Sequence, residues 1–281
     1  MKLIKKLAIM CLASLALLGM MVQAAEPRIS VQLWSVKDQI SEDFEGTLKK
    51  LAAMGFDGVE FARNFGPYAN NPAGLKAFLA EIGLEASGAH VGTDDIAPGK
   101  IHQTIAFYKT LGADHIVVPY DERAFDAKGI DKLIAELNTA AKTLEGYGMQ
   151  TGYHNHAQEF GDFKGATYWD YLAKNTSDKV ILQLDVGWAT VAGKDPIAFV
   201  ESYPGRTLST HIKASLPEGT EGKRQILGDD VTDWNAVISA MKKSGGTQWL
   251  VLEQEEYPDG LTPMQAVEKS MQGLQTILAD M

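Results

Sequence analysis

The sequence predicts a single-domain α/β protein with the (β/α)8 TIM-barrel fold, and three observations predict it. Short apolar or β-branched runs alternate with longer segments of helical spacing, a pattern typical of a parallel sheet covered by helices. Eight such units fit into the 281 residues once a short leader is set aside, which suits the size of this barrel. No G-x-G-x-x-G turn follows the first run, so a dinucleotide-binding doubly wound sheet is disfavoured.

Residues 1–24 are predicted to be a secretory signal peptide rather than part of the barrel. Three lysines among the first six residues form a positive segment, and residues 7–22 are almost wholly apolar. This apolar run is shorter than the roughly 20 residues that a membrane-spanning helix needs. We therefore expect cleavage near Ala24 and an exported protein, periplasmic or secreted and without a membrane anchor. The barrel is expected over residues 25–281.

The composition limits the partners of the exported chain. The single cysteine, Cys11, lies in the predicted signal peptide, so thiolate catalysis and cysteine-ligated zinc are excluded for the barrel. The formal net charge is −10, and removal of the leader lysines makes it more negative. This charge argues against nucleic acid and anionic membranes and favours a neutral or cationic small molecule. The sequence is also compatible with a homodimer.

Eight strands are expected in order along the chain. Each is a short run of apolar, small or β-branched residues that follows a helix-ending or turn segment, as a strand buried inside a barrel requires. The eight ranges are Ile29–Leu33, Gly58–Phe61, Glu85–Ala89, Ile116–Pro119, Gln150–Tyr153, Ile181–Leu184, Ser209–Ile212 and Trp249–Leu252.

Two of the intervening helices have the clearest patterns. The segment Ser41–Met54 carries an apolar stripe, with Ser41 as the expected N-cap and Gly55 as the stop. The segment Asp131–Tyr147 also places its apolar residues on one face and ends before Gly148. Such junctions of helix end, glycine and next strand are what repeated βα units need.

Polar and aromatic residues stand at equivalent positions at or near the C-terminal ends of the predicted strands. Active sites of this fold are built at the C-terminal ends of the strands. Ionisable residues are costly in a barrel interior unless they are paired or bind a metal, so these side chains are expected to converge on one mouth. They are Trp34, Glu60, His90, Tyr120, His154 with His156, Asp185, His211 with Lys213, and Glu253.

The last four strand ends predict a site for one divalent metal ion. His154, Asp185, His211 and Glu253 provide two imidazoles and two carboxylates in register. This mixed nitrogen and oxygen ligand set suits Mn²⁺, Mg²⁺, Co²⁺ or Zn²⁺, and we expect manganese first.

The sequence resembles the sugar phosphate isomerase/epimerase group of the xylose isomerase-like TIM barrels, over essentially the whole barrel. In that family the metal is held by residues that end strands five to eight, which implies the same four ligands here. The segments that carry the resemblance are Val31-Gln32-Leu33-Trp34-Ser35, Gly55-Phe56-Asp57-Gly58-Val59-Glu60-Phe61, Ser87-Gly88-Ala89-His90, Tyr153-His154-Asn155-His156, Leu184-Asp185-Val186-Gly187-Trp188, Thr210-His211-Ile212-Lys213 and Leu252-Glu253-Gln254.

One position departs from the family's epimerases. These enzymes usually have a glutamate where this chain has His154, and their two metal-bound glutamates exchange a proton from opposite faces of the substrate. Here only Glu253 of that pair remains. The His-x-His form resembles the inosose dehydratase branch and related keto-sugar lyases.

Two reactions therefore stay open. One is isomerisation or epimerisation of a keto-sugar or oxidised glycoside through an enediolate. The other is β-elimination from a keto-glycoside by a lyase or dehydratase. A phosphate ester is disfavoured, because phosphorylated sugars are largely intracellular and this chain is expected to be exported. In agreement, no Gly-rich loop or basic cluster follows the late strands.

Further side chains are assigned roles around the metal. Lys213 lies two residues beyond His211 and shares its face of the strand, so it is either an oxyanion stabiliser or a solvated rim lysine. His115 precedes the fourth strand and is interpreted as structural, and Glu159, Glu255 and Glu256 as solvated loop acids. The candidate catalytic residues are Glu253, His156, Lys213 and Glu60; the candidate substrate-binding residues are His90, Trp34, Trp188, Tyr120 and Arg224.

Two functions of other classes are less favoured than these reactions. Apurinic-site endonucleases share this barrel, but they place a histidine where this chain has Trp188, and no Asp-x-His segment follows His211. The acidic charge also disfavours DNA. A non-catalytic sugar-binding module is disfavoured by the complete ligand set, since binding alone does not require an open metal.

Overall fold

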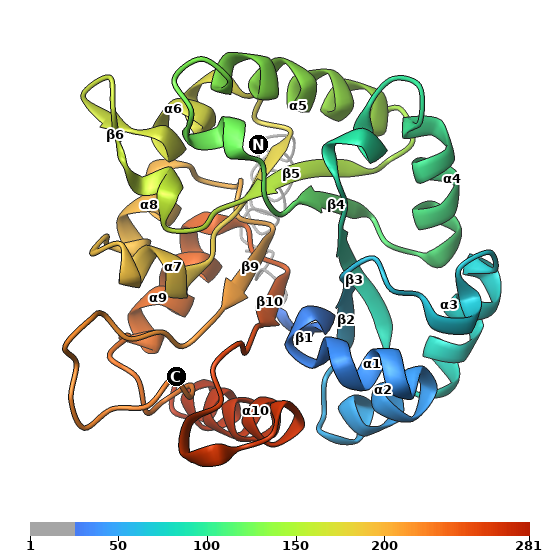
Figure 1. Ribbon diagram of the computed structural model, residues 1–281, viewed down its shortest axis with the longest axis vertical. Coiled ribbons are helices and arrows are strands. Elements are labelled where there is room, and N and C mark those ends of the chain that lie inside the picture. The colour runs from blue at the N-terminus through green and yellow to red at the C-terminus, as the bar shows by residue number, and fades with distance from the viewer. Residues whose placement is uncertain (1–25) are drawn as a thin grey trace, which may run out of the picture.

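The computed structural model describes residues 26–281, so the predicted signal peptide, residues 1–24, lies outside the described part of the chain. Eight parallel strands form a barrel with the helices around it, as predicted (Figure 1). Their order is β8-β5-β4-β3-β2-β1-β10-β9. The barrel closes between β8 and β9, where the His211 N–H donates to Leu184 O at 2.9 Å and Asp185 pairs with His211.

The eight barrel strands agree with the predicted runs to within one residue at each end. Among the strands of residues 26–281, only the two-stranded antiparallel hairpin of β6 and β7 was not predicted; it lies in the connection after β5. The strands are β1 (Arg28–Gln32), β2 (Gly58–Phe61), β3 (Glu85–His90), β4 (His115–Val118), β5 (Gln150–His154), β6 (Asp162–Phe163), β7 (Ala166–Thr167), β8 (Val180–Gln183), β9 (Ser209–Ile212) and β10 (Trp249–Leu252).

Helices cover the outside of the barrel, and apolar side chains fill the layer between them and the strands (Figure 1). In the described part of the chain no helix is both long and apolar enough to cross a membrane. The α-helices are α1 (Lys37–Glu42), α2 (Phe44–Ala53), α3 (Pro72–Glu81), α4 (Ile101–Leu111), α5 (Ile130–Glu145), α6 (Tyr168–Asn175), α7 (Val186–Val191), α8 (Pro196–Ser202), α9 (Trp234–Ala240) and α10 (Pro263–Ala279).

The helix predicted over 41–54 corresponds to α2, but it begins later than expected: Ser41 lies in the last turn of α1 and is not the N-cap. The Ser41 hydroxyl donates to Lys37 O at 2.8 Å within α1. Asp43 instead caps α2, because its carboxylate accepts the Gly46 N–H at 2.9 Å. The prediction failed because serine and aspartate two residues apart are both good caps, and only the turn between α1 and α2 selects one. Helix α5 confirms the second prediction, with shifted ends.

His115 is the first residue of β4 and is fully buried, as its structural interpretation requires. Its Nδ1 lies 2.7 Å from the Asp114 carboxylate. A Cβ added at Gly88 would lie 2.5 Å from its Nε2, so the neighbouring strand leaves room for this ring by carrying glycine.

We expect Gly273→Ala to destabilise the protein by about 3 kcal/mol, because overpacking usually costs this order of energy. Alanine normally favours a helix. Here, however, a Cβ at Gly273 of α10 would overlap the carbonyl oxygen of Leu227. Urea unfolding followed by circular dichroism measures the change. Gly99→Ala is the control, because nothing lies within 4 Å of its added Cβ. Equal stability of the two variants would contradict the packing argument.

Candidate metal centre

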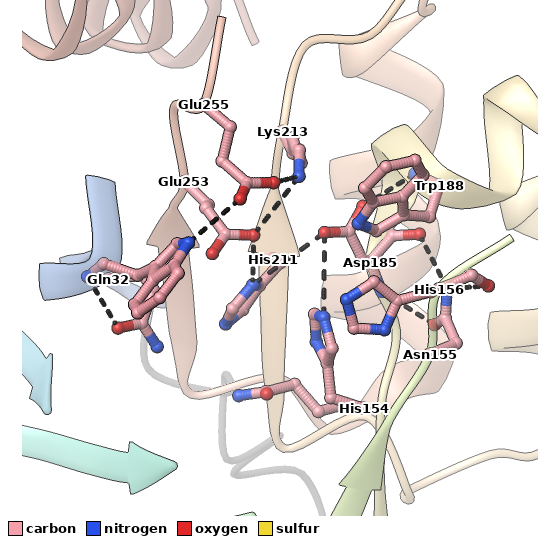
Figure 2. A network of polar contacts seen from close by, with 12 residues as sticks. Gln32, His154, Asn155, His156, Asp185, Trp188, His211, Lys213, Glu253 and Glu255 are labelled. Carbon is pink, nitrogen blue, oxygen red and sulfur yellow. Dashed lines mark hydrogen bonds and ion pairs between the residues drawn. The ribbon is translucent and has the colours of Figure 1, made fainter. Parts of the chain in front are cut away.

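The four predicted metal ligands meet at the C-terminal end of the barrel (Figure 2). Asp185 Oδ2 lies 4.0 Å from His154 Nε2 and 3.9 Å from His211 Nδ1, and His211 Nδ1 lies 3.1 Å from Glu253 Oε2. All four residues are buried, and one ligand atom from each lies within 4.8 Å of the others. Ligands about 2.1 Å from one ion are spaced in this way, so the set fits a single divalent metal.

The aspartate supplies an independent test of this fit. One oxygen, Asp185 Oδ1, accepts the Trp188 N–H at 2.8 Å and caps α7. The other, Oδ2, is buried and has no hydrogen-bond partner. Burial raises the pKa of Asp185 to about 7, because the protein alone leaves its charge poorly compensated. A buried carboxylate oxygen without a partner is costly, and a cation among the four ligands would satisfy it.

His211 is held from below by Glu60, which lies deeper in the barrel. The His211 Nε2–H donates to Glu60 Oε2 at 2.7 Å, which leaves Nδ1 for the metal. Burial alone would raise the pKa of Glu60, but the neighbouring His90 and His211 lower it to about 2. A carboxylate behind a metal-binding histidine fixes both the tautomer and the orientation of the ring.

Two buried glutamines complete this network, and the sequence interpretation missed both. Gln32 Nε2 and Gln183 Nε2 each donate to a Glu60 oxygen at 2.6 Å, and His90 Nε2 donates to Gln183 Oε1 at 2.8 Å. Both glutamines occupy the last position of their strand, β1 and β8. For Gln183, a polar residue that ends the otherwise apolar run Val180-Ile181-Leu182 was the signal that could have identified it.

We expect Glu60→Gln to raise the dissociation constant for the metal by about 10–100-fold, the usual effect of removing such a support. Both oxygens of the Glu60 carboxylate accept hydrogen bonds, one from Gln183 and the other from Gln32 and His211. In Glu60→Gln the side-chain NH₂ replaces one of these oxygens, and whichever one it replaces, it faces a donor. Calorimetric titration with Mn²⁺ measures the affinity. Glu45→Gln is the control, because its amide oxygen can still accept the Tyr68 hydroxyl. Unchanged affinity in Glu60→Gln would contradict the assignment.

Asn155, between the two histidines of the His-x-His segment, was also missed as a site residue. Its side chain is fully buried and clamps the ligand backbone (Figure 2). Its Oδ1 accepts the Asp185 N–H at 2.9 Å, and its Nδ2 donates to Asp185 O at 3.3 Å. This pair of hydrogen bonds connects the segments after β5 and β8, which carry two of the four ligands.

Lys213 is not a solvated rim lysine, since only 1% of its side chain is exposed. Its ammonium pairs with Glu255, lies 3.6 Å from Glu253 Oε2 and sits 4.4 Å from the centre of the Trp188 ring. Burial alone would lower the pKa of Lys213, but Glu253, Asp185 and Glu255 raise it, so the charge is kept. A permanent positive charge therefore stands beside the metal ligands.

Glu159 is buried as well, contrary to its interpretation as a solvated acid. A 3-10 turn (Gln158–Phe160) folds it back under the loop. Its two oxygens accept the Tyr153 hydroxyl and the His156 N–H, each at 2.8 Å. Glu159 thus fixes the backbone of the second histidine in the His-x-His segment. Glu255 is only half-buried, but it too is engaged, by Trp34 and Lys213.

A cavity of about 410 Å³ opens above the ligands. Six predicted residues line it, together with four that were not predicted. Arg63 is the notable addition, because its backbone has a φ of +65°, a conformation that non-glycine residues adopt mainly where the surroundings impose it. The lining residues are Trp34, His90, Tyr120, His154, His156 and Glu253, with Ala62, Arg63, Pro119 and Glu255.

Besides Lys213, three candidate catalytic or substrate-binding residues do not line the cavity. Glu60 is beneath the ligands and fully buried, so it does not face the cavity. Trp188 packs behind His156, with ring centres 5.5 Å apart. Arg224 is exposed and pairs with Asp229 and Asp259 in loops outside the cavity, so the structure gives no support to its substrate-binding role.

Known proteins resemble this chain in sequence and fold. The profile of the xylose isomerase-like TIM barrel family matches residues 48–277. An inosose dehydratase from Lacticaseibacillus casei is 24% identical over 263 residues, which cover 81% of this chain and 87% of that protein.

Solved structures give the same fold. A sugar phosphate isomerase/epimerase from Parabacteroides distasonis has a TM-score of 0.71 at 24% identity, covering 89% of this chain and 94% of that one. The IOLI protein with a bound zinc atom has a TM-score of 0.65 at 15% identity, with 90% and 98% covered.

Proposed function

The chain belongs to the xylose isomerase-like TIM barrel family, and from this premise we propose that it is a divalent-metal-dependent lyase that eliminates a β-oxygen substituent from a keto-sugar. It is an enzyme of a group whose named members include sugar isomerases and inosose dehydratases. The choice of elimination as its reaction rests on which acidic and basic side chains surround the candidate metal centre.

The observation that carries the proposal is an asymmetric cavity. Its two carboxylates, Glu253 and Glu255, both follow β10, whereas the lining residues at the end of β5 are the imidazoles His154, the last residue of the strand, and His156. Epimerisation by two carboxylates on opposite faces of the substrate would need a second carboxylate at the end of β5, where this chain has imidazoles instead. Elimination needs a single base beside the α-carbon and a proton for the departing oxygen.

His156 is the residue proposed as that base. Its half-buried ring lines the cavity against Tyr120 and Trp188. Burial lowers the pKa of His156 to about 4, so the ring is uncharged at neutral pH.

The reaction balances with this one residue as proton carrier. His156 takes the proton from the carbon beside the ketone, the electron pair forms a C=C bond, and the C–O bond to the leaving group breaks. The imidazolium then returns the proton to the departing oxygen, which gives an unsaturated ketone and an alcohol or water. A divalent ion, with Mn²⁺ proposed, would polarise the ketone and stabilise the negative charge that develops on its oxygen.

The remaining polar residues support this chemistry. The Lys213 ammonium offsets the charge of Glu253 and Glu255 beside the cavity. Glu60 orients His211 rather than moving a proton, because it is fully buried, does not line the cavity and already accepts hydrogen bonds from Gln32, Gln183 and His211. We further propose that the enzyme acts after export, so that a neutral keto-sugar or oxidised glycoside suits it better than a phosphate ester.

The test follows candidate 3-keto-glycosides by NMR in deuterated water with the metal-loaded enzyme. Release of the aglycone with formation of the unsaturated ketone is the expected result. Deuterium beside the ketone with an inverted centre and an intact glycosidic bond would instead establish epimerisation, the second candidate, for which Glu253 is the available carboxylate. Neither change across a broad panel of keto-sugars would refute both reactions.

A further inference from the structure

We propose that the cavity mouth holds a second ring beyond the reacting sugar, between Trp34 and Tyr120, so that the substrate is a keto-glycoside with a ring-bearing leaving group. This inference rests on the proposed elimination and names the substrate class for the same site. Its evidence is the position, exposure and fixation of the two aromatic side chains.

The metal ligands and the aromatic residues occupy different halves of the barrel mouth. The ligands lie at the C-terminal ends of β5, β8, β9 and β10, which are consecutive around the barrel. Trp34 follows β1 and Tyr120 follows β4, with β2 and β3 between them. A ketone bound over the ligands therefore leaves the part of the cavity between Trp34 and Tyr120 for the rest of the substrate.

Both aromatic side chains are unusually exposed for residues that line a cavity. The exposed fraction is 46% for Trp34 and 47% for Tyr120. Large aromatic side chains gain the most from burial, and a pair exposed at one opening marks a binding surface. The cavity volume of about 410 Å³ lies within the range of sites that bind drug-sized ligands.

The two side chains are also held in place before any ligand binds. The Trp34 indole N–H donates to Glu255 at 3.1 Å, its backbone N–H donates to Gln32 Oε1 at 3.1 Å, and the Lys37 ammonium lies 4.0 Å from its ring centre. Tyr120 packs edge-on against His156, with ring centres 5.5 Å apart. Preorganised rings bind with a smaller loss of side-chain entropy than mobile ones, which favours a recognition role.

The chemistry of this subsite is that of a flat ring face with polar edges. Aromatic rings stack on aryl groups and on the C–H face of a pyranose. Between the two aromatics, the side chain of Arg63 is 64% exposed and can donate to ring oxygens. An aryl and a glycosyl leaving group share this chemistry, and the experiment separates them.

The experiment compares methyl, phenyl and glucosyl 3-keto-glucosides, which share the reacting ring and differ in the leaving group. We expect kcat/KM for at least one ring-bearing substrate to exceed that of the methyl glycoside by about tenfold or more. A series of alkyl 3-keto-glucosides without a second ring, whose leaving groups differ in acidity, corrects this comparison for the intrinsic reactivity of each leaving group. Trp34→Ala and Tyr120→Ala should each reduce this preference to less than about threefold. Preference for phenyl alone identifies an aryl group, and preference for glucosyl alone identifies a sugar.

Tyr147→Ala is the matched control, because Tyr147 is 41% exposed but lies just beyond α5, outside the cavity. An equal preference in wild type and the two cavity variants would overturn the subsite. If no glycoside is turned over, the proposed elimination fails, and dissociation constants of the same three compounds still decide the subsite. Tighter binding of a ring-bearing compound that the two variants abolish would then support it, and equal binding would refute it.

Discussion

Asp185→Asn is expected to reduce the bound divalent metal from about one ion per chain to less than about a tenth, and to lower kcat/KM by at least about 10³-fold. The substitution preserves shape, and the amide oxygen can still accept the Trp188 N–H that caps α7. It removes the charge from Oδ2, the oxygen that has no partner in the protein. Metal analysis by plasma mass spectrometry and the rate of elimination measure the two losses.

Asp195→Asn is the matched control for this substitution. Asp195 also caps a helix, since its carboxylate accepts the Ile197 N–H at 2.9 Å at the start of α8, but it is not a ligand. This variant should retain the metal. Full metal content in Asp185→Asn would remove the basis of the four-ligand site, whereas three zinc ions in the wild type would revive the nuclease interpretation.

His156→Asn is expected to lower kcat by about 10²–10⁴-fold, the usual contribution of a general base, while the metal content stays near one ion per chain. The backbone at this position remains fixed, because Glu159 binds its N–H rather than its ring. Steady-state kinetics, the rate of deuterium exchange beside the ketone and metal analysis distinguish a lost base from a lost ligand.

His102→Asn serves as the control, because this imidazole lies on the outer helix α4, 3.2 Å from the Tyr147 hydroxyl. It should react at the wild-type rate. If His156→Asn loses its metal, His156 is a ligand and not the base. If it keeps both the metal and the rate, the proton is taken by another group, and Glu253 becomes the candidate to test.

The barrel and its four ligands were predictable because both depend on local pattern. A parallel strand buried on both faces favours a short run of apolar, small or β-branched residues, and the eight runs are recognisable without knowing how they pair. Once the fold is a barrel, residues ending separate strands must meet at one mouth. His154, Asp185, His211 and Glu253 are therefore equivalent by position, and the structure places them within 4.8 Å of one another.

The supporting contacts depended on distances across the barrel, which no local pattern contains. Glu60 and Gln183 lie 123 positions apart in the chain, but in the barrel Gln183 Nε2 lies 2.6 Å from Glu60 Oε1. The burial of Lys213 beside Trp188 and Glu255, and that of Glu159 against Tyr153, likewise depended on how the segments after several strands pack together. The sequence by itself determined which residues end the strands. Only the tertiary structure decided which side chains face the metal, the cavity or the solvent, because burial and pairing of charges arise from packing between distant segments.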